Sequence, residues 1–130
     1  MSGLPEEREI DLYVEKSIQR LTAAKQLLES GFYEDAAGRA YYAMFFAAKA
    51  MLLRKNIVTK THRGLISAFG SEYVQKNIVD AEYGRILSIA EELREEVDYS
   101  VIRIINRDEA SSIINDAEHF IAMAKKILYQ

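Results

Sequence analysis

Two short stretches of the sequence carry side chains that could act on an anion. The first, LREEVDYS, contains Arg94, Asp98 and Tyr99. On a helix Arg94 lies one turn before Asp98, so the two can form an ion pair with the Tyr99 hydroxyl beside them. The acidic residues around this arginine make the local field negative, which repels phosphate. They are Glu91, Glu92, Glu95, Glu96 and Asp98. We expect either an ordinary charged helix end with one ion pair or a binding site that needs cations from a partner chain.

The second stretch, RKNIVTKTHR at residues 54–63, is basic and contains no acid. If Thr61 caps the helix that follows, free backbone N–H groups lie beside Lys60, His62 and Arg63. A helix N-terminus with cations nearby can bind a nucleotide phosphate, an RNA backbone or an acidic partner surface. The alternative is a basic turn that only faces solvent. These four residues are the better candidates for an anion or nucleotide site.

A third candidate is Arg39, one turn before Tyr42 in the same predicted helix. A buried arginine needs a carboxylate, and Asp35 stands four residues upstream. We therefore expect Asp35 and Arg39 to form an internal structural pair.

Metal chemistry has little support. A di-iron site in a helical bundle needs paired Glu-x-x-His motifs, but Thr59 and Asp116 stand three residues before His62 and His119. The chain has no cysteine, which excludes thiolate zinc sites and iron–sulfur clusters and fits a reducing compartment. We find no phosphate-binding or dinucleotide-binding glycine motif. We expect no metal and no cofactor.

The composition is that of a folded protein: 130 residues, 49% hydrophobic and 28% charged, with a net charge of −3. This length predicts one domain over residues 1–130. The negative charge means that any nucleic-acid binding needs a local patch. The first residues lack the apolar run of a signal peptide, and the longest uncharged run, residues 40–48, is too short to span a membrane. We expect a cytoplasmic protein without membrane binding.

Apolar residues recur at helical spacing through almost the whole chain, and no stretch alternates with period two. Gly31 suits the end of the first helix, Gly70 could break the third, and Asp108 is a plausible N-cap of the last. The segment DYSVIRIIN (98–106) has no polar face, so we expect a packed irregular connection. The spacing predicts five helices, over residues 11–30, 34–55, 61–76, 80–97 and 108–129. Their short connections indicate an all-α, antiparallel bundle with a four-helix up-and-down core.

The stretch AGRAYYAMFFAAKAML (37–52) places four aromatic rings among alanines. Tyr41 and Phe45 share one face of the predicted helix, and Tyr42 and Phe46 lie on the neighbouring face. Apolar residues wrap more than half of the circumference, which predicts a central helix that other helices approach closely through its alanines. A core helix is one interpretation, a face shared with a second subunit is another, and both can hold.

The sequence resembles the HEPN domain, in particular the small prokaryotic group often encoded beside a minimal nucleotidyltransferase. The resemblance rests on GFYEDAAGRAYYAMFFAAKAMLL (31–53), TKTHRGLISAFG (59–70) and ELREEVDYS (92–100), and it spans most of the chain. It implies an α-helical bundle that is usually a homodimer. It also implies a role in a toxin–antitoxin or defence-type pair with a nucleotidyltransferase-fold partner, and some relatives are metal-independent ribonucleases.

The ribonuclease relatives carry an arginine, four to six residues, and then a histidine. Here Arg94 matches the arginine, but Tyr99, Ser100 and Val101 occupy the three histidine positions. Histidine titrates near neutral pH and can move a proton there, whereas a phenol with an ordinary pKa of about 10 is a poor base. We therefore expect the ribonuclease motif to be lacking.

We expect a subunit that dimerises and binds its nucleotidyltransferase-fold partner. The alternative is an RNA- or nucleotide-binding protein, or a weak ribonuclease, that uses Arg94 and the basic turn 54–63. The two hypotheses separate on whether Arg94, Tyr99 and this turn face a common cleft.

Overall fold

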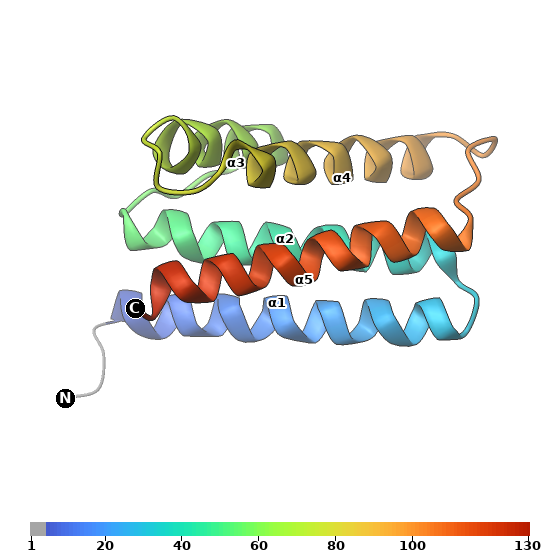
Figure 1. Cartoon of the computed structure of the whole chain (residues 1–130), viewed down its shortest axis with the longest axis horizontal. Coiled ribbons are helices and arrows are strands. Elements are labelled where there is room, and N and C mark those ends of the chain that lie inside the picture. The colour runs from blue at the N-terminus through green and yellow to red at the C-terminus, as the bar shows by residue number, and fades with distance from the viewer. Residues whose placement is uncertain (1–4) are drawn as a thin grey trace.

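The computed structural model describes residues 5–130. In this range the chain is the predicted all-α bundle of five helices, with one π-helical turn that was not predicted (Figure 1). The elements are α1 (Pro5–Glu29), α2 (Tyr33–Arg54), α3 (His62–Phe69), η1 (Gly70–Val74), α4 (Ala81–Tyr99) and α5 (Arg107–Leu128). No helix in residues 5–130 has the length and apolar character needed to cross a membrane. Residues 1–4, on which the expected lack of a signal peptide partly rests, lie outside the described residues.

Helix α2 is the centre of the bundle. It contacts each of the other four helices, with α1 and α5 along one side and α3 and α4 along the other (Figure 1). Its buried small residues are Ala36, Ala37, Ala40, Ala43, Ala47, Ala48 and Ala50. Alanine side chains let neighbouring backbones come close, while Tyr41, Met44 and Met51 fill the remaining space. The prediction of a central helix is confirmed.

Helices α1 and α5 begin at signals that the sequence analysis did not select. Helix α1 begins at Pro5 rather than at residue 11, because proline suits the first helical position and acidic residues follow it in the first turn. Helix α5 begins after Asn106, not at an Asp108 cap. The Asn106 side chain accepts a hydrogen bond from the Glu109 amide (2.8 Å), and Glu109 accepts one from the Asn106 amide (3.3 Å). This reciprocal capping box satisfies two amides that one aspartate cap would leave unpaired.

The third predicted helix is broken at Gly70, as expected. Helix α3 ends at Phe69 and continues as the π-helical turn η1, in which the Gln75 amide donates to the Gly70 carbonyl (2.8 Å). The Tyr73 side chain on this turn is buried, and its hydroxyl donates to the Met51 carbonyl of α2. That bond fastens η1 to the central helix.

The connection between α4 and α5 is not packed, contrary to the prediction. Helix α4 continues to Tyr99, and Ile105 is the only large apolar side chain of residues 100–106 that is buried. Arg103 holds this segment outward, because its guanidinium donates to Glu96 at the end of α4 (3.1 Å) and to Glu109 at the start of α5 (2.5 Å). The apolar pattern was misleading because these ion pairs, not apolar burial, fix the shape of the connection.

Candidate functional site

Four side chains from three helices meet between α2, α3 and α4, and we call them the ionic cluster: Tyr41, His62, Glu91 and Arg94. The Tyr41 hydroxyl lies 2.6 Å from His62 Nδ1, and this nitrogen lies 3.3 Å from Glu91 Oε2. Arg94 Nη2 donates to Glu91 Oε1 at 2.5 Å. A single buried carboxylate therefore joins the histidine of one sequence stretch to the arginine of the other.

The start of α3 places His62 in the cluster. Thr61 caps this helix as predicted, since its hydroxyl accepts a hydrogen bond from the Gly64 amide at 2.9 Å. His62 is then the first helical residue, and its ring packs on the aromatic side chains of α2. The ring centroids lie 4.8 Å from Phe45, 5.7 Å from Tyr41 and 5.8 Å from Tyr42. Aromatic packing thus fixes the imidazole while its outer part stays accessible, with 36% of the side chain exposed.

Helix α4 supplies the charges. Glu91 and Arg94 are one turn apart, and their side chains are only 9% and 14% exposed. Arg94 also donates to Asp98 Oδ2 at 2.7 Å, so the predicted ion pair is confirmed. The guanidinium additionally lies over the Tyr41 ring, 5.4 Å from its centroid. One arginine therefore balances two carboxylates, and little of its charge remains for an external anion.

The proton on His62 follows from this arrangement. Glu91 Oε2 is buried and has no hydrogen bond of normal geometry, although it faces Nδ1. Because an ionised carboxylate only accepts hydrogen bonds, we assign the proton to Nδ1, where it points toward Glu91 and the Tyr41 oxygen. In a neutral ring this assignment leaves Nε2 with a free lone pair, and no described residue hydrogen-bonds to it. A carboxylate behind an imidazole is the arrangement that orients a general base.

Burial and charge fix the other two protonation states. Burial raises the pKa of Tyr41 far above its ordinary value, and the adjacent Glu91 carboxylate raises it further. Burial of the Arg94 guanidinium works to lower its pKa, but the hydrogen bond to Glu91 and the negative charge of that group outweigh this effect, so the pKa is raised. Tyr41 therefore remains a phenol and Arg94 a cation throughout the physiological range.

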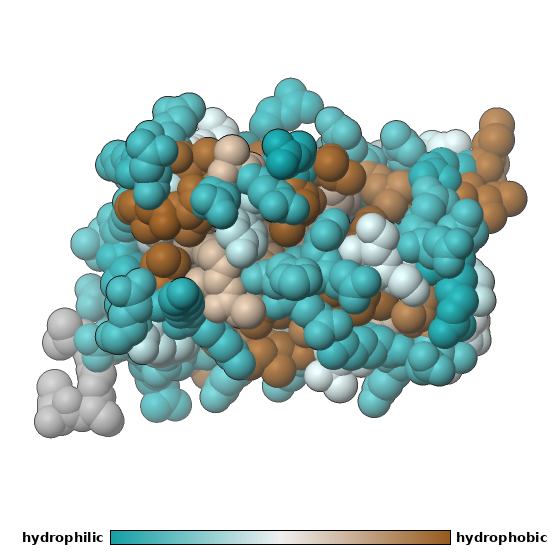
Figure 2. Space-filling model, in the orientation of Figure 1, coloured by the Kyte–Doolittle hydropathy of each residue, from teal (hydrophilic) through white to brown (hydrophobic). Residues whose placement is uncertain are grey.

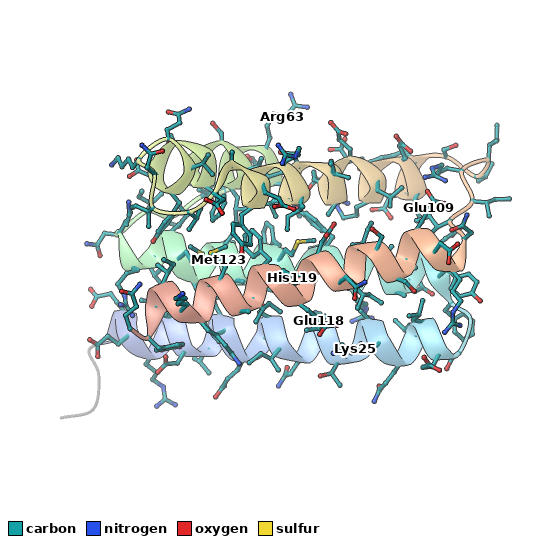
Figure 3. All side chains as sticks on the ribbon, in the orientation of Figure 1. Lys25, Arg63, Glu109, Glu118, His119 and Met123 are labelled. Carbon is teal, nitrogen blue, oxygen red and sulfur yellow. The ribbon has the colours of Figure 1, made fainter. Side chains whose placement is uncertain are left out.

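The remaining predicted site residues lie elsewhere. Tyr99 exposes 86% of its surface and does not join the cluster. Lys60 and Arg63 are exposed, and Figure 3 shows Arg63 extending from α3 away from the bundle. A small pocket between α2, α4 and α5 is lined by Arg94 and Asp98, but by no residue of the basic turn. The basic turn is thus divided: Lys60 and Arg63 face solvent, Lys55 donates to the Glu72 carbonyl at 2.6 Å, and His62 joins the ionic cluster.

The prediction of an internal Asp35–Arg39 ion pair is wrong. Both residues are exposed, and no ion pair joins them among residues 5–130. They stand at the exposed edge of α2, where each charge faces solvent.

Sequence reasoning did not select Tyr41 or Glu91 for the site. Glu91 stands three residues before Arg94, a spacing that brings helical side chains together and could have identified it. Tyr41 had no local signal, because its contact with His62 joins residues 21 positions apart on different helices. Within residues 5–130 no group of three or more histidine, aspartate or glutamate side chains is arranged to hold a metal ion.

Known proteins match this chain over nearly its whole length. Residues 10–127 match the HEPN domain family. "Putative toxin MJ0605" from Methanocaldococcus jannaschii is 42% identical over 92% of this chain and 89% of its own. A UPF0332 protein from Archaeoglobus fulgidus is 40% identical over 90% and 93%. The crystal structure of TT1696 from Thermus thermophilus has a similar fold, with a TM-score of 0.76 at 17% identity over 95% of this chain and 98% of that one.

Removing Arg94 should destabilise the protein far more than removing Asp98. Arg94→Ala leaves Glu91 buried without its cation, so we expect a loss of about 3–5 kcal/mol in the free energy of unfolding. Asp98→Ala breaks a pair whose carboxylate is half-exposed and should cost less than about 1 kcal/mol. Urea unfolding measures both values. In the double variant Glu91→Gln, Arg94→Ala part of the loss should be recovered, and equal losses for the two single variants would contradict a buried charge pair.

Stability should fall at alkaline pH in a way that depends on Tyr41. Above about pH 10 the unfolded chain loses its tyrosine protons, whereas folded Tyr41 keeps its own because its pKa is raised. The contribution of this group is therefore intact below about pH 10 and is lost as the pH rises further. In Tyr41→Phe the free energy of unfolding, measured in urea between about pH 9 and 11, should decline less steeply. The same slope in both proteins would show that Tyr41 does not carry this effect.

Proposed function

Since this chain belongs to the HEPN domain family, we propose that it is the toxin-type subunit of a two-protein pair. In this proposal it forms a homodimer and binds a partner of the nucleotidyltransferase fold. The names of two relatives in Methanocaldococcus jannaschii, both called putative toxins, support the first part. Their sequences align with 92% and 93% of this chain, so the similarity extends over nearly the whole HEPN domain.

The observation that carries a binding role is the internal neutralisation of Arg94. Its guanidinium already holds Glu91 and Asp98, and exposed acidic residues of α4 surround it, namely Glu92, Glu95 and Glu96. A phosphate group would have to displace a carboxylate from Arg94 and enter a negative field. This cost disfavours RNA cleavage at Arg94 by the chain alone and favours recognition of another protein.

The aromatic face of α2 supports a homodimer. Tyr42, Phe45 and Phe46 are only partly buried and lie on one side of this helix with Gly38. Nothing lies within 4 Å of the position that a Cβ would take at Gly38, so the surface there is open. A second copy could cover these rings through the same face, as a two-fold interface requires.

The proposal is tested by mixing the purified protein with a nucleotidyltransferase-fold protein from the same organism. We expect the chain alone to sediment as a dimer at micromolar concentration, and the mixture to give a larger species that contains both proteins. A monomer mass for the chain alone would contradict the dimer. Two independent boundaries in the mixture would contradict the partnership.

A second candidate function is RNA or nucleotide binding, with weak ribonuclease activity, at Arg94 and the basic turn 54–63. The position of His62 favours it, because the imidazole is held by Glu91 on one side and is accessible on the other. A histidine and Arg94 therefore share one carboxylate, Glu91, although the linear arginine–histidine spacing is absent. The exposed Lys60 and Arg63 could attract a phosphate backbone to this edge.

Single-stranded RNA incubated with purified protein tests this second function. If His62 moves the proton, His62→Ala should lower the cleavage rate by about 10²-fold or more, and added imidazole should restore part of it. His119→Ala is the matched control, because His119 is the other histidine of the chain and is exposed on α5 (Figure 3). Absence of cleavage by the wild-type protein would exclude the ribonuclease activity, and equal rates for both variants would exclude His62 as the group that moves the proton.

A further inference from the structure

The last residue of α4 and the connection to α5 expose large apolar side chains to water. Tyr99, Val101, Ile102 and Ile104 are 86%, 102%, 85% and 74% exposed, and we call these four side chains the apolar cap. Figure 2 shows apolar side chains projecting at the upper right, where Figure 1 places this connection. Single exposed apolar residues are ordinary, but a contiguous group of this kind marks a surface that another molecule covers.

The cap is held in this exposed position. Arg103 donates to Glu96, to Glu109 and to the neighbouring Ile104 carbonyl, the last at 2.6 Å. The charges of Glu96 and Glu109 in turn raise the pKa of Arg103, mainly through its hydrogen bond to Glu109, so the cation persists. Below it, Ile105 is buried and anchors the segment to the core. These bonds and the buried Ile105 hold the apolar side chains outward before any partner binds, which lowers the cost of ordering the connection on binding.

The acidic side chains around the apolar cap indicate what kind of molecule can bind it. Glu92 and Glu95 on the last turns of α4 are exposed and form no ion pair with any described residue, and Asp98 and Asp108 flank the connection. The nearby arginines are occupied, Arg103 by two glutamates and Arg107 by Glu29 at 3.6 Å. An acidic border repels RNA and anionic lipid, but it complements a protein surface rich in lysine or arginine.

We propose that the apolar cap docks into an apolar groove bordered by lysine and arginine on the partner protein. This inference rests on the proposed function in one respect, namely that the partner has the nucleotidyltransferase fold. The cap supplies the buried anchors of the interface, and the acidic end of α4 supplies its charged rim. The ionic cluster and the basic turn take no part in this contact.

The dissociation constant of the complex tests the cap. The double variant Val101→Asp, Ile102→Asp should weaken binding at least about tenfold, because both side chains would place a charge in an apolar groove. Val58→Asp is the matched control and should bind within about twofold of wild type. Val58 is 77% exposed on the connection between α2 and α3, at the other end of the molecule (Figure 1). All these side chains are exposed, so thermal unfolding should be unchanged in each variant.

A second pair of substitutions tests the charge complementarity. Glu92→Lys with Glu95→Lys should slow association about tenfold at low salt, and the difference from wild type should shrink at high salt. Hydrogen exchange should show protection of the amides of residues 100–106 in the complex. Unchanged affinity in the Val101, Ile102 variant, or protection confined to other helices, would overturn the inference.

The outcomes separate this inference from the proposed function. If wild type binds the nucleotidyltransferase-fold protein and the cap variant binds equally well, only the docking surface is wrong. If wild type binds no such protein, both are wrong. Sedimentation of the wild-type protein with phosphatidylglycerol vesicles, lost in the cap variant, would assign the cap to a membrane surface and overturn the inference.

Discussion

The close approach of four helices to α2 is the constraint on which this structure depends. Alanine at seven buried positions removes bulk from most of the surface of that helix, so neighbouring backbones can pack against it from both sides. Alanine has little apolar surface of its own to bury. Most of the apolar surface buried around α2 therefore comes from the neighbouring helices and from a few large side chains, among them Tyr41, Met44 and Met51. A larger residue at an alanine position would separate two helices rather than fill a space.

The two sides of α2 are held differently. Toward α1 and α5 the buried contacts are mainly apolar. The polar exceptions include the Ser17 hydroxyl, which donates to the Ala43 carbonyl at 2.6 Å, and Arg54, which donates to the Leu128 carbonyl at 3.2 Å. Toward α3 and α4 a buried carboxylate, an arginine, an imidazole and a phenol lie among the apolar contacts. Helix α3 has eight residues and would not be stable alone. Its position depends on the Thr61 cap, on the packing of His62 and on the hydrogen bond from Tyr73 to Met51. On this side of α2, hydrogen bonds and ion pairs therefore orient the helices more than the buried apolar surface does.

The sequence allowed the helices and some of their polar features to be predicted, because these depend on local spacing. Apolar periodicity located five helices, and the i,i+4 rule located the Arg94–Asp98 pair. Asn106 and Asp108 are both good capping residues, so only the backbone conformation decides between them. The contact of Glu91 with His62 joins two helices and follows from packing alone. The apolar cap was misjudged because apolar residues usually indicate burial, whereas Arg103 fixes them outward by bonds that reach seven residues back and six forward.

The π-helical turn at residues 70–74 has a consequence for how related chains are aligned. A hydrogen bond from residue i+5 to residue i encloses one more residue per turn than an α-helix does, so this turn accommodates an additional position without moving the flanking helices. A homologue one residue shorter here could continue α3 as a regular helix and still direct an aromatic ring toward α2. Length differences between Phe69 and Gln75 are therefore expected to be structurally neutral, and a gap in an alignment belongs there rather than inside α2 or α4.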